Sequence, residues 1–349
     1  LSLVGSEMCI RDREETGYDP IALLTLYVKR SLSGLSVIGD TDHVEAFMFS
    51  CESLDERTVE VLKQVAAGLS LKTKNFFYQS YAESFYQYMV HQPEDIWVRQ
   101  VLLCDYHSDV MKIYRMECNR RTTPMVVYIE KDERNFFACG DYPEEEEKKQ
   151  NVFTQMDEKM LTMAQELAEG QMITSVYLIG EGFSEEWMKV SLRFLCRNRR
   201  VFQGNNLYSK GACYALRERL YPTEISGRYV FLGEDKLKAN IGMKVYRQGE
   251  SSYLALLDAG VSWYDARFQT EVYLEEGNSF DIVLTPLNGK DARYGKVTLT
   301  GLPERKTPTR LYIEISMTGE NKVRLYVEDL GFGELSPSGY QKWTENFEI

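Results

Sequence analysis

The spacing of apolar residues changes along this chain, and the change limits the folds open to it. Up to about residue 220, segments with helical spacing alternate with short apolar runs, as in a mixed α/β domain. Beyond residue 225, apolar residues recur at every second position, for example at Phe280, Ile282 and Leu284, and turn residues such as Gly277 and Asn278 separate the segments. A period of two with turns between segments predicts an antiparallel all-β domain, and a sandwich is the expected form.

The switch in period also places a domain boundary. Pro222 ends the last helical pattern, so the boundary is expected between residues 222 and 240. The chain has 349 residues, which is enough for two domains with cores of their own. We therefore expect an α/β region over 14–222, a β-sandwich over 223–335, and a tail over 336–349.

Residues 1–13 are excluded from this prediction. They read LSLVGSEMCIRDR, which resembles translated sequencing-adapter sequence, so we interpret the segment as an artefact and expect the native N-terminus to be lost. A disordered tail is the alternative. A signal peptide is not favoured, because the apolar stretch is short and Glu7 interrupts it.

Composition excludes several classes of function. The net charge of -12 argues against nucleic-acid binding, which usually needs a basic face. The sequence has no uncharged apolar run long enough to cross a membrane, so no membrane partner is expected. The seven cysteines are scattered and the three histidines are far apart, so neither predicts a metal site or a disulfide framework. Reduced cysteines and a globular composition predict a cytoplasmic protein.

Local signals locate the first elements. Helical spacing predicts a helix over 19–34, and a Val- and Phe-rich run predicts a strand over 43–49. Ser53 and Glu56 then have the spacing of a capping box, in which both side chains satisfy free backbone N–H groups. The helix that follows is expected to stop at Gly68.

Further along, strand and helix signals continue to alternate. Two strands are expected within 98–116, and the charge run Glu144 to Glu147 is expected to be a solvated loop. Thr154 is expected to cap a helix, a buried strand is expected over 175–179, and Ser184 is expected to cap the next helix. This alternation favours an α/β fold.

Three stretches, taken in order, resemble the DnaK-type heat-shock chaperones and their actin-like relatives. Residues 101–105 resemble the strand and loop that hold the phosphates, 176–183 resemble the turn that packs against adenosine, and 210–215 resemble a helix near the end of that ATPase domain. Thr298 to Pro303 resembles part of the peptide-binding β-sandwich. Asp329 to Glu334 is also similar to an uncharacterised bacterial domain-of-unknown-function family related to these chaperones.

The resemblance covers residues 18–330 and implies an architecture. It implies an actin-like ATPase (ribonuclease H-like) domain that is truncated at its N-terminus, with 14–95 as the remnant of the first lobe and 96–222 as the second lobe. It also implies that the sandwich binds a protein or peptide partner. ATP or ADP with Mg²⁺ is the implied ligand. The implied nucleotide-binding residues are Gly180, Glu181, Gly182, Gly211, Asp105 and Ser108.

Departures from the resembled family decide what function to expect. The family's phosphate loop reads D-x-G-G-G-T, whereas this chain reads Asp105 to Val110 without a glycine and with an added negative charge at Asp109. Gln79 stands at the family's glutamate position, and glutamine cannot act as a general base. Glu83 lies one turn further and is the alternative base, although it is not favoured. No catalytic residue is therefore assigned.

Two interpretations remain open at the glycines and at Asp105. Gly180 and Gly182 are expected either to face adenosine or to form a tight strand-to-helix turn that needs no ligand, and Asp105 is more readily a turn residue than a ligand of magnesium-bound water. The leading hypothesis is a degenerate protein that acts by binding and not by turnover. It would bind nucleotide weakly, a protein partner, or both. The alternatives are an active chaperone-type ATPase whose remaining site lies upstream, and a pure scaffold without nucleotide.

Overall fold

The computed structural model describes all residues except 1–18, 38, 40–42, 288–290, 306 and 335. The segment 1–13 therefore lies outside the described residues. The chain separates into two compact units. Of the described residues, unit 1 holds those within 19–54 and 60–231, and unit 2 holds those within 55–59 and 232–349. The division falls after Phe231, inside the expected interval of 222–240, because a short strand at 229–231 still belongs to the sheet of unit 1.

Unit 1 contains a six-stranded mixed sheet with the order β7-β6-β3-β4-β5-β8. The first three strands of this sheet, β3 to β5, form an antiparallel meander, and β6 and β7 add in parallel beside β3. The strands are β3 (Gln100–His107), β4 (Val110–Asn119), β5 (Met125–Asn135), β6 (Ile173–Ile179), β7 (Arg200–Gln203) and β8 (Tyr229–Phe231).

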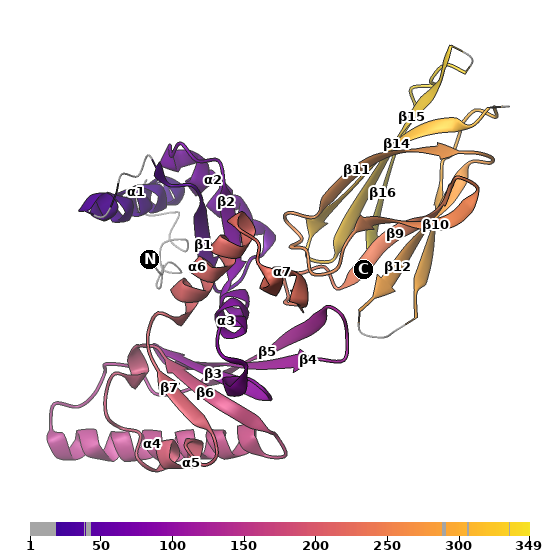
Figure 1. Ribbon diagram of the computed structural model, residues 1–349. Helices are drawn as coiled ribbons and strands as arrows, with labels where there is room; N and C mark the ends of the chain where they lie inside the picture. The colour runs from indigo at the N-terminus through magenta and orange to yellow at the C-terminus, as the bar shows by residue number, and fades with distance from the viewer. Residues whose placement is uncertain (1–18, 38, 40–42, 288–290, 306, 335) are drawn as a thin grey trace. The chain divides into compact units, whose positions relative to one another are not determined.

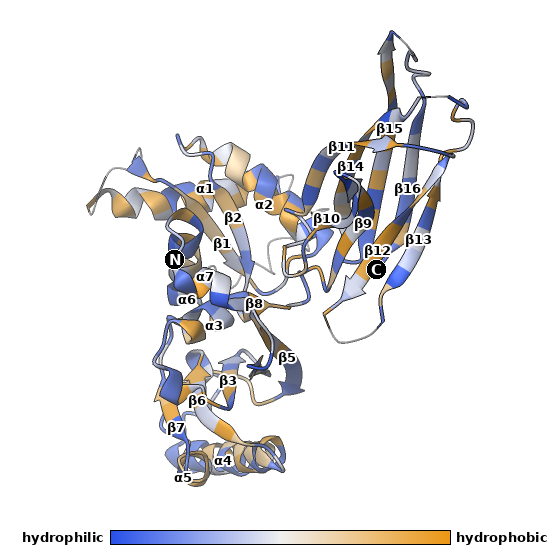
Figure 2. Ribbon diagram, turned by 45° about the vertical axis from the view of Figure 1, so that its right-hand side comes forward, coloured by the Kyte–Doolittle hydropathy of each residue, from blue (hydrophilic) through white to orange (hydrophobic). Residues whose placement is uncertain are grey.

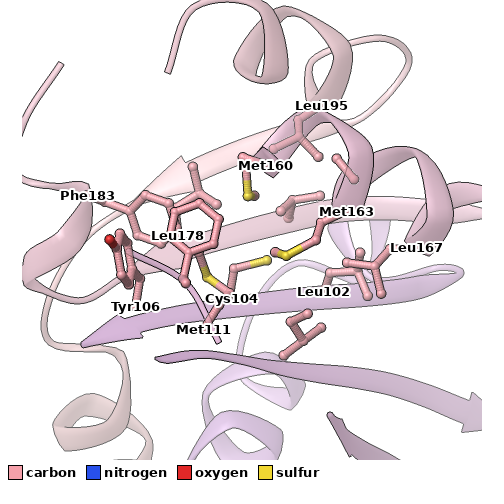
Figure 3. Close-up of a cluster of buried hydrophobic side chains, with 14 of the residues drawn as sticks. Leu102, Cys104, Tyr106, Met111, Met160, Met163, Leu167, Leu178, Phe183 and Leu195 are labelled. Carbon is pink, nitrogen blue, oxygen red and sulfur yellow. The ribbon is translucent and has the colours of Figure 1, made fainter. Parts of the chain in front are cut away.

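Helices cover both faces of this sheet. Figure 1 shows α4 (Glu146–Ala168) and α5 (Val190–Leu195) below the sheet, and α3 (Tyr81–Val90) and α6 (Leu207–Leu220) above it. Successive side chains of a strand point to opposite faces of the sheet. Leu102 and Cys104 of β3 therefore belong to the cluster between the sheet and α4, and Leu103 belongs to the cluster between the sheet and helices α3 and α6. The near-continuous apolar run of β3 is thus explained by burial on both faces. Figure 3 shows the cluster on the α4 face.

The N-terminal part of unit 1 repeats the order of the later elements. It contains α1 (Pro20–Ser33), β1 (Phe47–Cys51), α2 (Glu56–Leu69), β2 (Phe76–Ser80) and α3. The same order of helix, strand, helix, strand and helix recurs as α4, β6, α5, β7 and α6, and in both series the two strands are parallel. We call residues 20–90 the N-terminal repeat and residues 100–220 the C-terminal repeat. Among the described residues, the meander precedes the second series but has no counterpart before the first.

Three helix starts differ from those predicted. The side chain of Asp55, and not that of Ser53, caps α2 by accepting a hydrogen bond of 2.6 Å from the backbone N of Thr58. The charge run is not wholly a loop, because α4 begins at Glu146, where acidic residues suit the positive end of the helix dipole. Thr154 therefore lies inside α4, and its hydroxyl donates to the carbonyl of Gln150 at 2.9 Å.

The predicted helix start at Ser184 is also wrong. Residues 181–183 form a single 3-10 turn, and α5 begins only at Val190. Asp157 of α4 caps α5 from outside, with 2.7 Å and 2.9 Å hydrogen bonds from the backbone N atoms of Val190 and Ser191. A cap supplied by a distant helix leaves no local sequence signal, which is why the local pattern misplaced the helix start.

Unit 2 consists of two antiparallel four-stranded sheets, with the orders β10-β9-β12-β13 and β11-β14-β15-β16, as a β-sandwich requires. Figure 2 shows hydrophilic and hydrophobic residues alternating along its strands. The expected tail over 336–349 is not a tail, because it contributes β16, which pairs along β15. The strands are β9 (Ala239–Arg247), β10 (Glu250–Leu257), β11 (Arg267–Leu274), β12 (Ser279–Pro286), β13 (Arg293–Thr298), β14 (Thr309–Gly319), β15 (Lys322–Glu334) and β16 (Lys342–Glu348).

Candidate functional site

The expected phosphate loop is the hairpin turn between β3 and β4. The turn has no glycine, and Ser108 takes a left-handed conformation with φ of 53°. Two backbone N–H groups from the segment after β5 donate hydrogen bonds to carbonyl groups of this turn. The distances are 2.6 Å from Phe136 N to Asp109 O and 2.6 Å from Cys139 N to Ser108 O. The turn is therefore fastened to a neighbouring segment rather than held open.

Asp105 lies near the end of β3, and its carboxylate is buried with two side-chain contacts. Its Oδ2 accepts a 2.8 Å hydrogen bond from the hydroxyl of Tyr208 on α6, and its Oδ1 lies 3.1 Å from Nε2 of His107. The hydrogen bond with Asp105 raises the pKa of His107 above its ordinary value, although burial opposes the shift. Oδ2 is thus occupied by the Tyr208 hydroxyl, whereas Oδ1 has only the contact with His107. The bond to Tyr208 favours a structural role for Asp105 over that of a magnesium-water ligand.

The two glycines after β6 are explained by Tyr106. Gly180 has a positive φ of 106°, and a Cβ atom there would overlap the backbone of Tyr106. A Cβ atom on Gly182 would overlap the ring of Tyr106, which is fully buried and whose hydroxyl donates a 2.6 Å hydrogen bond to the carbonyl of Phe137. Of the two interpretations left open by the sequence, these contacts favour the tight turn, because a tyrosine ring already occupies the space that the glycines leave.

Glu181 lies between these glycines and closes the site from another side. Its Oε1 atom accepts a 3.3 Å hydrogen bond from the backbone N of Ser108. The Ser108 amide, which the resemblance assigns to a phosphate, therefore binds a carboxylate of the same chain. With Asp109 close by, the turn presents negative charge, which repels phosphate groups.

Gln79 and its neighbours form a second, buried group on the N-terminal repeat. The side chain of Gln79 is fully buried, and its Nε2 donates a 3.2 Å hydrogen bond to the hydroxyl of Ser84, which lies 2.9 Å from the hydroxyl of Ser50. Glu83, the alternative base, is buried as well, and its carboxylate lies 3.9 Å from the guanidinium of Arg219. Neither side chain is presented to solvent in the way that a general base for water attack requires.

Gly211 has a structural explanation too. A Cβ atom there would overlap the backbone carbonyl of Ser84, so the glycine allows α6 to cross α3 at close range. The rings of Tyr81 and Tyr208 stack beside this crossing with 4.2 Å between their centroids. Gly211 therefore belongs to the joint between the two repeats.

An ion-pair cluster joins the two repeats near the turn between β3 and β4. Glu52, which follows β1, accepts hydrogen bonds of 2.5 Å from Lys112 on β4 and 2.7 Å from Lys131 on β5. Burial alone would raise the pKa of Glu52, but its bonds with the two lysines outweigh burial and lower it. The lysines that could attract an anion here are thus neutralised in part by Glu52.

The structure brings the expected residues into two groups. Asp105, Ser108 and the turn 180–182 meet around the hairpin, whereas Gln79 and Gly211 lie at the crossing of α3 and α6. Sequence reasoning missed Tyr106, Tyr208 and the Glu52 cluster. The alternation along β3 could have indicated Tyr106, since it shares a face with Leu102 and Cys104.

Other features of the described residues lie away from this hairpin. A cavity of about 410 Å³ is lined by residues of α2, β2 and the segment between them, from Lys63 to Tyr78. A search of the described residues finds no group of three or more histidine, cysteine, aspartate or glutamate side chains placed to hold a metal ion. Within the same residues, every helix is too short or too polar to cross a membrane.

Comparisons with known proteins give two family matches and several distantly similar solved structures. No curated protein matches the chain. A solved structure titled "Alp12 filament structure" is similar with 11% sequence identity and a TM-score of 0.32, over 43% of this chain. This chain spans 56% of the length of that one.

The family matches divide the chain close to the boundary between the units. A domain of unknown function, DUF8552, matches residues 236–349. The C-terminal model of a family of unknown function, DUF5716, matches residues 5–234, beginning inside the segment interpreted as an artefact. The latter match covers more than half of the chain, so the chain belongs to the DUF5716 family.

Proposed function

We propose that unit 1 is a degenerate actin-like domain that acts by binding and does not hydrolyse ATP efficiently. The strands lie side by side in the order β5-β4-β3-β6-β7, an antiparallel meander followed by two parallel strands, which supports the mixed α/β domain that the resemblance implies. The repeated order of elements supports a two-lobed domain, with the N-terminal repeat as the partial first lobe. Fold alone does not set activity, so the proposal depends on the residues of the site.

The packing of Tyr106 carries the proposal. In the resembled family, the equivalents of Gly180 and Gly182 approach the adenosine, whereas here their open faces contact Tyr106. ATP could enter only if this buried ring moved, which would expose a large aromatic surface to water. Nucleotide binding is therefore weak at most in the proposed function. Gln79 adds a second reason against turnover, since its amide cannot accept a proton from water.

The β-sandwich is the proposed partner-binding part. Tyr246, Tyr253 and Tyr294 lie on one sheet and are 74%, 47% and 62% exposed. The register places Lys244 opposite Tyr253, and the Lys244 ammonium lies 5.4 Å from the ring centroid of Tyr294. Gly242, on the same face of β9, has no side chain, so the ring of Tyr253 lies across the strand.

These tyrosines form an exposed aromatic surface of a kind that favours protein contacts. Tyrosine is enriched at binding hot spots because it buries a large rigid area at low entropic cost. An extended polypeptide with apolar side chains is the partner that this surface fits, since it can lay those side chains on the rings while its backbone stays solvated. We call Tyr246, Tyr253 and Tyr294 the tyrosine face.

ATP turnover is tested on the purified chain with Mg²⁺. The proposal expects phosphate release at background level and a shift in melting temperature below about 1 °C at millimolar ATP, because a ligand must bind the native state to stabilise it. Steady phosphate release that Asp105→Ala abolishes would support the active ATPase alternative. A large ATP-dependent shift without turnover would show that nucleotide enters despite Tyr106.

The tyrosine face is tested with a carboxymethylated, permanently unfolded model protein as the probe. The Tyr253→Ser/Tyr294→Ser variant should lose about tenfold in affinity, since hot-spot truncations cost more than about 1 kcal/mol each. Tyr273→Ser is the matched control, because Tyr273 is 57% exposed but lies on the other sheet. Equal losses in both variants, or no binding by the parent, would favour the pure scaffold alternative.

A further inference from the structure

One edge of β1 has no strand beside it among the described residues. β1 pairs only with β2, in parallel, with Phe47 opposite Phe76 and a 2.9 Å hydrogen bond from Phe47 N to Asn75 O. In a parallel pair, successive residues direct their backbone groups to opposite sides. Phe47 and Phe49 therefore bond to β2, whereas the N–H and C=O groups of Met48 and Ser50 are directed to the open edge.

The C-terminal repeat shows what covers such an edge. β6 takes the place of β1 in that repeat, and β7 takes the place of β2. The edge of β6 away from β7 is paired in parallel with β3, for example Val176 with Leu102 and Leu178 with Cys104. The first strand of an antiparallel meander thus occupies the position that is open beside β1.

The helices of the two repeats give an independent observation. α4 buries Met156, Met160 and Met163 in the same cluster as the meander residues Leu102 and Met111 (Figure 3). α1 precedes β1 as α4 precedes β6, yet it exposes an apolar group. The exposed side chains are Leu23, Leu26 and Tyr27, at 49%, 54% and 56%. An open strand edge and an uncovered helix face are the two features that a meander covers in the C-terminal repeat.

We propose that β1 accepts a strand that runs parallel to it and begins an antiparallel meander, donated by the N-terminal region of a full-length DUF5716 protein. The matching model is described as the C-terminal part of its family, which points to that source. A two-stranded sheet has marginal stability alone, and parallel sheets normally occur buried in larger ones. The meander would pair with Met48 and Ser50 and cover Leu23, Leu26 and Tyr27.

A second copy of this chain fits the edge less well. Two identical strands related by a twofold axis in a symmetric dimer run antiparallel to each other, whereas the C-terminal repeat pairs this edge in parallel. The inference goes beyond the proposed function, because it depends neither on nucleotide nor on the tyrosine face. Its failure would leave the tests of ATP turnover and of the tyrosine face unaffected.

Hydrogen exchange provides the first test. The probe is the polypeptide that precedes the DUF5716 C-terminal region in a full-length family protein, added to this complete chain. The amides of Met48 and Ser50 should gain at least about tenfold protection when the probe binds, because they enter a sheet ladder. The Phe49 amide is an internal control, since it already faces β2. Absence of binding, or binding without protection at Met48 and Ser50, overturns the proposal.

A pair of variants provides the second test. Met48→Pro removes the N–H at the open edge without removing a bond to β2, and proline is tolerated at such edges. Met48→Ala is the matched control, since it shortens the side chain but keeps the N–H. Met48→Pro should weaken probe binding at least about tenfold relative to Met48→Ala, and the free variants should melt within a few degrees of each other. Equal probe affinities overturn the proposal.

Two further outcomes would also contradict it. If Met48→Pro alone unfolds the free chain, the edge N–H is already in use within the fold. If Met48 and Ser50 become protected as the concentration of the chain rises without the probe, a second copy is the occupant. Leu26→Asp should weaken probe binding without lowering the melting temperature of the free chain, which tests the helix face separately from the strand edge.

Discussion

The two repeats of unit 1 have the same order of elements but differ in how fully their apolar surfaces are buried. In the C-terminal repeat, β3 and β6 have strands on both sides and helices on both faces, and side chains such as Met160 and Val176 are fully buried. In the N-terminal repeat, β1 has one neighbouring strand among the described residues, and α1 exposes Leu26. The same order of helices and strands is therefore compatible with a complete or an incomplete core. The core is complete in the repeat that includes the meander β3 to β5.

Deleting a buried side chain gives the largest expected effect of this comparison. Met160→Ala removes a fully buried side chain from the cluster under α4, which should lower the free energy of unfolding by about 3 kcal/mol. Leu26→Ala at the exposed face of α1 should change it by less than about 0.5 kcal/mol. Urea denaturation measures both. A similar loss in the two variants would show that the exposed face of α1 is buried in solution, contrary to the comparison.

The close crossing of α3 and α6 tests the joint between the repeats. Gly211→Ala places a methyl group against the carbonyl of Ser84, so the helices must separate, and overpacking of this kind costs about 2 kcal/mol. Gly204→Ala is the control, because no atom lies within 4 Å of its added Cβ position. Thermal unfolding should show a lower melting temperature for Gly211→Ala only. An unchanged melting temperature would mean that the repeats are not held together at this crossing.

The smallest expected effect concerns the pH dependence of the hairpin. Because the pKa of His107 is raised in the folded state, the pairing with Asp105 adds stability that is fully present below about pH 6.5 and is lost as the pH rises through the raised value. The side chain is 36% exposed, so solvent screening should keep the effect below about 1 kcal/mol. His107→Gln should flatten this part of the curve of unfolding free energy against pH. A parent protein whose stability rises over the same interval would contradict the sign.

The sequence predicted the fold class of unit 2 but not its full extent. The period of two at Leu311, Ile313 and Ile315 reflects side chains that alternate between the core and the opposite face of the sheet, so it could be recognised. β16 was mistaken for a tail because its residues, Lys342 to Glu348, are mostly exposed and carry no clear alternation. β8 was missed because three residues are too few to show a period. Edge strands such as β16 depend on a partner that local sequence does not reveal.

The candidate site shows a similar division. The sequence located Asp105 and the glycines of the turn 180–182, since loop residues after strands are conspicuous. It could not decide what the glycines contact, because a glycine that admits a ligand and one that admits a ring from another strand look alike. Tyr106 reaches Gly182 only through the pairing of β3 with β6, and Asp157 reaches α5 only through helix packing. Contacts between distant segments therefore account for what was missed.

The strand β8 has a consequence for how the chain folds during synthesis. β8 pairs with β5 through Met125 with Tyr229 and Val127 with Phe231, so the sheet of unit 1 gains its last strand only when the chain has been made up to residue 231. Pairings between segments so far apart in sequence slow folding, because loop-closure entropy must be overcome before the contacts form. Until then, the outer edge of β5 is open in the nascent chain.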